Sequence, residues 1–108
     1  MAAARAVTDA TFATEVLQSR KPVIVDFWAE WCMPCRKIDS TLSQLAATDL
    51  ADKVEFVKID IDANPETTRA YQVMSVPTVT VFKGGEPVQS ITGARPKNDL
   101  QRMIEAVL

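Results

Sequence analysis

The sequence predicts an α/β protein in which one mixed five-stranded sheet is flanked by four helices on both faces. Apolar, β-branched runs alternate with helical patterns along most of the chain, a glycine-containing connection separates two late strands, and the last segment is an amphipathic helix. Strand–helix–strand crossovers favour parallel strands, whereas a short hairpin requires antiparallel ones. The predicted element order is therefore βαβαβαββα, in one domain that spans residues 1–108.

The first strand–helix unit is short. A strand around residues 5–7 precedes a helix that Thr8 or Asp9 can cap. This helix is expected to end near residue 20, because Pro22 cannot continue it.

The second unit begins with a buried strand. The run Val23–Trp28 is apolar at every position except Asp26, which is typical of a central strand covered on both faces. Helical spacing of apolar residues then continues to about Ala47, and Pro34 suits the first turn of that helix. Ligands of such sheets meet the loops at the carboxyl ends of strands, which is where this connection lies.

The remaining elements complete the sheet. Residues 54–61 form a strand rich in β-branched residues, and residues 66–71 form a short helix. Two further strands, Thr78–Phe82 and Val88–Thr92, are joined by residues 83–86, where glycines accept the positive φ of a hairpin turn. The apolar stripe of the final helix consists of Leu100, Met103, Ile104, Val107 and Leu108.

Composition narrows the range of functions. The chain has 108 residues with 12 basic and 14 acidic side chains, and a net charge of −2 gives no reason to bind nucleic acid or an anionic membrane. The opening residues 1–7 lack the apolar stretch of a secretory signal, and no later segment is long enough to span a bilayer. We therefore expect a cytoplasmic protein, and a monomer.

The motif Cys32-Met33-Pro34-Cys35 contains the only two cysteines of the chain. A thiol at a helix start faces unpaired backbone N–H groups and the positive end of the helix dipole, which stabilise its thiolate. We assign Cys32 as the nucleophile that attacks a substrate disulfide, and Cys35, one turn further on, as the thiol that resolves the mixed disulfide.

Other uses of two closely spaced cysteines fit less well. A c-type haem site needs histidine after the second cysteine, but Arg36 follows it and the chain has no histidine. A closed zinc site needs four ligands, which two cysteines without histidine do not supply. We expect no metal.

Asp26 is a carboxyl group inside an otherwise apolar strand. Burial there should raise its pKa, so that it exchanges protons near neutral pH. Its place just before the dithiol favours a role as proton acceptor for Cys35 over a local hydrogen-bonding role. Lys58 also interrupts an apolar strand; it can pair with Asp26 if their strands are neighbours, or extend to solvent.

Several segments together resemble one known family. They are Val25-Asp26-Phe27-Trp28-Ala29-Glu30-Trp31-Cys32, Pro34-Cys35, Val76-Pro77-Thr78, Phe82-Lys83, Gly85-Glu86 and Gly93. Over essentially its whole length the chain resembles the thioredoxin family. The resemblance implies the thioredoxin fold and a general reductase of disulfide-containing substrate proteins. It also implies that a flavoprotein, thioredoxin reductase, delivers electrons from NADPH, and that no cofactor is bound to the chain itself.

The resemblance further implies a substrate-binding surface beside the dithiol. Pro77 should be a cis-proline that faces the cysteines, with the backbone of Val76 pairing to an extended peptide. The other residues implied in substrate binding are Trp31, Met33, Pro34, Gly85 and Gly93. Of the two tryptophans, we expect Trp28 to support the core and Trp31 to be exposed.

Two positions depart from the pattern of the family. Met33 replaces the usual glycine between the cysteines, and Ser40 replaces a proline that commonly bends the following helix. Because the residues between the cysteines tune the redox poise, a thiol oxidase or isomerase is an alternative to the reductase. A third hypothesis is a non-catalytic interaction module that uses the same surface to bind a partner protein.

Overall fold

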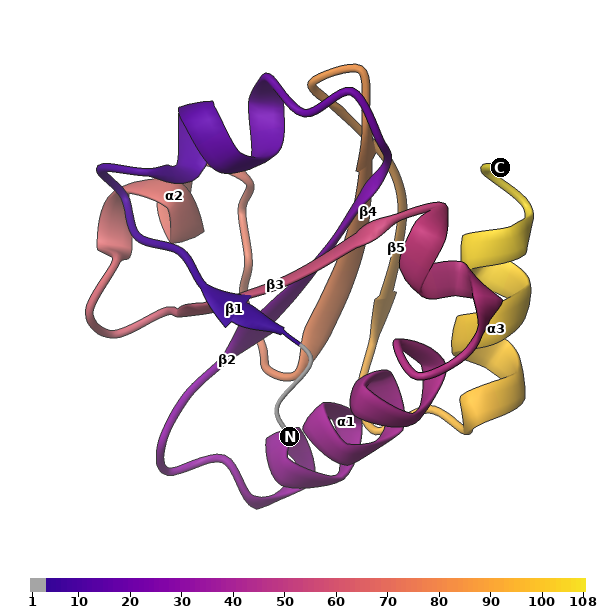
Figure 1. Cartoon of the computed structure of the whole chain (residues 1–108). Coiled ribbons are helices and arrows are strands. Elements are labelled where there is room, and N and C mark those ends of the chain that lie inside the picture. The colour runs from indigo at the N-terminus through magenta and orange to yellow at the C-terminus, as the bar shows by residue number, and fades with distance from the viewer. Residues whose placement is uncertain (1–3) are drawn as a thin grey trace.

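A five-stranded mixed sheet runs through the centre of the molecule, with helices on both of its faces (Figure 1). The computed structural model describes residues 4–108. The strands are β1 (Arg5–Ala6), β2 (Val23–Trp28), β3 (Glu55–Asp60), β4 (Thr78–Lys83) and β5 (Glu86–Thr92). The helices are the π-helical η1 (Ala13–Leu17), α1 (Met33–Leu45), the 3₁₀ turn η2 (Asp49–Asp52), α2 (Pro65–Ala70) and α3 (Lys97–Glu105).

The order of strands in the sheet is β1-β3-β2-β4-β5. β3 runs parallel to both β1 and β2, while β4 runs antiparallel to both β2 and β5. The predicted α/β class and element order are confirmed, with η1 as the first of the four expected helices and η2 as an additional short turn. The central strand β2 has the predicted bounds, Val23–Trp28.

Two apolar clusters cover the two faces of this sheet. One includes Ile24 and the side chains that α1 and α3 present to the sheet, such as Ile38 and Leu100. The other includes Val25 and Phe27 with the segment around η1. Since alternate residues of a strand point to opposite faces, Asp26 lies on the same face as Ile24, beneath α1.

The first helix differs from its prediction. It comprises only residues 13–17, and the carboxylate of Asp9 caps a different helix, accepting hydrogen bonds from the backbone N–H groups of Glu66 (3.2 Å) and Thr67 (2.8 Å) at the start of α2. The Asn64 side chain in turn accepts from the Asp9 N–H at 2.8 Å. Of the two predicted caps, Asp9 therefore caps α2 and not the first helix, whereas the Thr8 hydroxyl accepts a hydrogen bond from the Thr11 N–H at 3.3 Å just before η1.

Residues 1–3 of the opening segment, in which we expected no secretory signal, lie outside the described part of the chain. Within residues 4–108, no helix combines the length and the apolar character needed to cross a bilayer.

The β4–β5 hairpin turns on two glycines in succession. Gly84 and Gly85 have φ angles of 62° and 82°, which only glycine adopts without strain. A Cβ atom added to Gly85 would lie 3.0 Å from the backbone oxygen of Leu17 in η1, whereas one added to Gly84 would meet nothing within 4 Å. Of the two glycines, only Gly85 is packed tightly against η1.

These two glycines provide a matched pair for measuring that packing. Gly84→Ala should destabilise the protein by about 1 kcal/mol, the usual penalty of positive φ, and Gly85→Ala by about 2 kcal/mol or more, because backbone must also move. Urea unfolding of both variants measures the difference. Equal losses would show that η1 yields freely to the added methyl group.

Candidate active site

The two cysteines form a disulfide at the start of α1. Cys32 is the N-cap of this helix and Cys35 lies in its first turn, with Cα atoms 5.4 Å apart. The backbone N–H of Cys35 points to the Sγ atom of Cys32 at 3.1 Å. Both residues are nearly buried, with exposed fractions of 4% and 3%. This is the site that the strand–turn–helix prediction placed at the end of β2.

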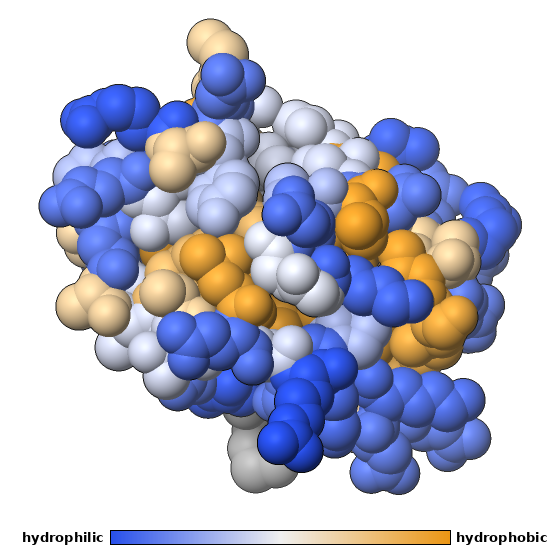
Figure 2. Space-filling view, turned by 90° about the horizontal axis from the view of Figure 1, so that it is seen from above, coloured by the Kyte–Doolittle hydropathy of each residue, from blue (hydrophilic) through white to orange (hydrophobic). Residues whose placement is uncertain are grey.

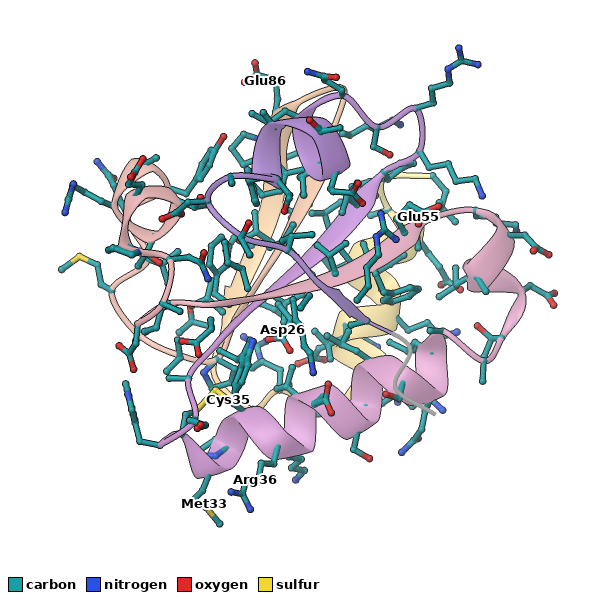
Figure 3. All side chains as sticks on the ribbon, turned by 60° about the vertical axis from the view of Figure 1, so that its left-hand side comes forward. Asp26, Met33, Cys35, Arg36, Glu55 and Glu86 are labelled. Carbon is teal, nitrogen blue, oxygen red and sulfur yellow. A yellow bond between two sulfur atoms is a disulfide. The ribbon has the colours of Figure 1, made fainter. Side chains whose placement is uncertain are left out.

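Apolar side chains surround the outer side of the disulfide. Trp31 is 67% exposed and Met33 66%, and the Trp31 Nε1–H donates to Asp62 Oδ2 at 2.8 Å. Val76 packs against the disulfide from the loop before β4, and the peptide bond between Val76 and Pro77 is cis. Figure 3 shows Met33 pointing outward, away from the sheet.

Gly93 closes the same end of the sheet. Its N–H donates to the carbonyl of Pro77 at 2.9 Å, and its φ of 95° lets β5 end beside the cis-proline loop. Pro34 is exposed in the first turn of α1. Of the residues implied in substrate binding, six therefore lie around the disulfide: Trp31, Met33, Pro34, Val76, Pro77 and Gly93.

Gly85 is the exception. Thr78, where β4 begins, pairs with Phe27 near the disulfide, but Phe82 pairs with Val23 at the opposite end of β2. The turn that follows places Gly85 at that far end, against Leu17. Figure 2 views this far end, a mixture of hydrophilic and apolar side chains. The structure therefore does not bring Gly85 together with the other six residues, because the hairpin carries it to the opposite end of β2.

Asp26 lies beneath the disulfide, between the sheet and α1 (Figure 3). Its side chain is 1% exposed, and the Oδ1 atom has no hydrogen-bond partner among the described residues. Loss of hydration raises the pKa of Asp26 to about 7; the negative charge of Asp39 adds to this rise and the positive charge of Lys58 opposes it. The predicted direction of the pKa is confirmed.

Lys58 lies beside Asp26 on the neighbouring strand. The two residues are register partners in the parallel pair of β2 and β3, so their side chains emerge on the same face. The Lys58 ammonium also lies 5.5 Å from the ring centroid of Trp28, which is half-buried and lines the space beneath the disulfide. The two strands are neighbours, as pairing of Lys58 with Asp26 requires, but among the described residues no ion pair joins the two side chains, and the Lys58 ammonium lies over the Trp28 ring.

A cavity of about 190 Å³ connects these groups to the disulfide. It is lined by Asp26, Trp28, Ala29, Glu30, Cys32, Cys35, Arg36, Asp39 and Lys58. Asp39 was not predicted from the sequence, although Cys32, Cys35 and Asp39 follow the spacing i, i+3, i+7, which places all three on one side of a helix. The buried acid, the cysteine pair and the lysine thus line one partly open cavity.

This geometry can hold a thiol pair and exchange a proton with it. Within residues 4–108 there is no group of three or more side chains suited to bind a metal ion. A reversible cysteine pair at a helix N-terminus, with a proton-exchanging carboxyl group beneath it, defines a thiol–disulfide oxidoreductase.

Comparison with known proteins identifies the family. The sequence profile of the thioredoxin family matches residues 3–106. A thioredoxin from Streptomyces clavuligerus is 54% identical over 96 residues, which cover 89% of this chain and 88% of that protein. A thioredoxin from Mycobacterium tuberculosis (strain ATCC 25618 / H37Rv) is 50% identical over 102 residues, covering 94% and 87%. The chain belongs to the thioredoxin family, and it reduces protein disulfides by thiol–disulfide exchange with its own cysteine pair as the redox group.

A third relative has a different architecture. A bifunctional thioredoxin reductase/thioredoxin from Mycobacterium leprae (strain TN) is 45% identical over 102 residues, which cover 94% of this chain and 22% of that protein. The thioredoxin part of that protein therefore corresponds to nearly the whole of this chain.

The buried acid should make stability depend on pH. Because the pKa of Asp26 is about 7 in the folded protein against an ordinary 3.8, the folded protein retains a proton that the unfolded chain releases, and stability falls as pH rises from about 4 to 7. Asp26→Asn should remove this dependence, so its gain in unfolding free energy should be about 2–3 kcal/mol larger at pH 8 than at pH 5.

Urea unfolding of the oxidised protein at both pH values tests this expectation. Asp49→Asn, which removes an exposed carboxylate far from the cavity, controls for the change in net charge. An Asp26→Asn gain that is the same at both pH values would contradict the raised pKa.

Proposed function

We propose that Cys32 attacks the disulfide of a substrate protein and that Cys35 then releases the product. The observation that carries this assignment is the position of Cys32 at the N-cap, where its sulfur accepts the Cys35 N–H at 3.1 Å. A thiolate at that place is stabilised by this N–H group and by the helix dipole. The exposed side chains of Trp31 and Met33 adjoin Cys32 and face the solvent from which a substrate arrives.

The proposed reaction has two exchange steps. The Cys32 thiolate attacks one sulfur of the substrate disulfide, forms a mixed disulfide and expels the other substrate sulfur as a thiolate. The Cys35 thiolate then attacks the Cys32 sulfur, forms the intramolecular disulfide and expels the second substrate thiolate. Both substrate thiolates take protons from solvent, so the substrate gains two electrons and two protons, and the cysteine pair loses them.

Asp26 is the proposed proton acceptor for Cys35. A thiol must lose its proton before it attacks, and a buried carboxylate with a pKa of about 7 is a stronger base than an ordinary one. The cavity that both residues line supports direct or water-mediated transfer between them. In this proposal Lys58 limits the rise in the pKa of Asp26 and so keeps part of it ionised at neutral pH.

The substrate is proposed to bind as an extended segment across the apolar residues around the disulfide. The exposed faces of Trp31 and Met33 supply apolar contact. The loop at Val76, packed against the disulfide and leading into β4, supplies backbone groups for pairing.

The electron donor is proposed to be an NADPH-dependent flavoprotein, thioredoxin reductase. The M. leprae relative, which joins a thioredoxin reductase and a thioredoxin in one protein, supports this pairing. We further propose that the chain acts as a monomer on disulfide-containing proteins in the cytoplasm.

The division of labour between the cysteines can be tested by trapping. Cys35→Ser should still attack a substrate disulfide and should accumulate about one mixed disulfide per molecule, whereas Cys32→Ser should accumulate none. Mass spectrometry after acid quench measures both. Accumulation on Cys35 in the Cys32→Ser variant would reverse the assignment.

The role of Asp26 predicts a defect confined to the second step. Asp26→Asn should form the mixed disulfide at nearly the normal rate but resolve it about 10- to 100-fold more slowly at pH 7, at or below the usual range of general-base effects. The defect should shrink at pH 9, where bulk base deprotonates Cys35. Rapid-quench kinetics separate the steps, and unchanged resolution would remove Asp26 from the mechanism.

A further inference from the structure

Asp39 contributes a second carboxylate to the cavity beneath the disulfide. It lies on α1, four residues after Cys35, and its side chain is half-buried. Within residues 4–108, none of the ion pairs involves Asp39. A charge that lines a small, partly open cavity and is held in no ion pair there acts on the other charged groups that line it.

The charge of Asp39 acts on Asp26 in this cavity. The Oδ1 atom of Asp26 is buried without a hydrogen-bond partner among the described residues. No local hydrogen bond therefore stabilises a negative charge on this atom, and nearby charges affect it strongly. The charged groups that line the cavity around Asp26 are Lys58 from β3, Asp39 and Arg36 from α1, and Glu30 from the β2–α1 connection. On β4, the register partner of Asp26 is the uncharged Val79.

Two of these groups act on Asp26 in opposite senses. Lys58 favours its carboxylate form, whereas Asp39 favours its protonated form by like-charge repulsion. Arg36 and Glu30 are exposed, where water screens their charges more strongly. Burial has the largest effect on the proton affinity of Asp26, and the balance between a β-strand cation and a helix anion adjusts it further.

We propose that Asp39 is a positioning residue of the redox reaction, whose negative charge, acting across the cavity, keeps Asp26 basic enough to take the proton of Cys35 near neutral pH. Asp39 makes and breaks no bond; it shifts only the equilibrium between the acid and the carboxylate of Asp26. The inference rests on the proposed role of Asp26. A general base works best when its pKa lies near the working pH. The carboxylate of Asp39 contributes by helping to raise the pKa of Asp26 toward that range.

The experiment follows the protonation of Asp26 directly in the full-length oxidised protein. Carboxyl ¹³C shifts of Asp26 are recorded as a function of pH for the natural sequence and for Asp39→Asn, Asp39→Glu and Lys58→Gln. Asp39→Asn should move the Asp26 midpoint to lower pH by about half a pH unit, Lys58→Gln should move it to higher pH, and Asp39→Glu should largely preserve it. Asp49→Asn should leave it unchanged, because that exposed carboxylate lies outside the cavity.

The same variants are then followed in the resolution step, with a fluorescent peptide disulfide as the probe. Asp39→Asn should slow resolution about twofold above pH 7, because a weaker base removes the Cys35 proton, while formation of the mixed disulfide stays unchanged. A structural disturbance of α1 would instead slow both steps and would not be rescued by Asp39→Glu.

The outcomes separate this inference from the proposed function. An Asp26 midpoint that Asp39→Asn leaves in place, in a protein where Asp26→Asn still slows resolution, would overturn the role of Asp39 alone. A midpoint that moves as expected, with resolution indifferent to Asp26→Asn, would instead overturn the role of Asp26 and with it the functional meaning of Asp39.

Discussion

The pairing of β2 with a neighbour on each side is the constraint on which the site depends. β3 fixes Lys58 opposite Asp26 on one side, and β4 places Val79 opposite it on the other. The backbone of β2 therefore cannot rotate to expose its carboxyl group, although exposure would lower the free energy of the carboxylate. The same strand ends at Trp28, only four residues before Cys32. The short connection therefore holds the start of α1 close to the end of the sheet.

Burial of Asp26 lowers the stability of the folded protein and makes the carboxylate a stronger base, both because the buried carboxylate loses its hydration. A pKa of about 7 against an ordinary 3.8 corresponds to about 4 kcal/mol of folding free energy withheld at high pH, an appreciable part of the stability of a small domain. The surrounding apolar clusters on both faces of the sheet offset this loss. A fold stabilised mainly by hydrophobic burial can therefore hold one ionisable group out of water, as an acceptor for a thiol proton requires.

The sequence predicts local patterns well and long-range partnerships less well. Val23–Trp28 was found with its predicted bounds because an apolar run and its ends are properties of neighbouring residues. Asp9 was misassigned because its best partners, the N–H groups at the start of α2, are more than fifty residues away. Gly85 was grouped with the residues around the disulfide because a sequence motif shows that glycine is present but does not show which contact requires it. In the structure that contact is with the backbone of Leu17. Asp39 was not predicted as a site residue, although its helical spacing from the cysteines is visible in the sequence. A charged residue on an amphipathic helix ordinarily faces solvent, so the spacing alone does not indicate a cavity residue.

The disulfide lies between the exposed outer side of the site and the inner cavity, and substitutions can change these two sides independently. Met33, which stands where the family usually has glycine, is 66% exposed and points outward (Figure 3), so it faces the side from which a substrate is proposed to bind and not the cavity. Asp39 lies on the inner side and lines the same cavity as Asp26. A change at position 33 should then alter which disulfides are attacked, whereas a change at position 39 should alter the pH at which the attack is completed. The scaffold of β2 and α1 keeps these effects apart because Cys32 and Cys35, nearly buried, stand between them.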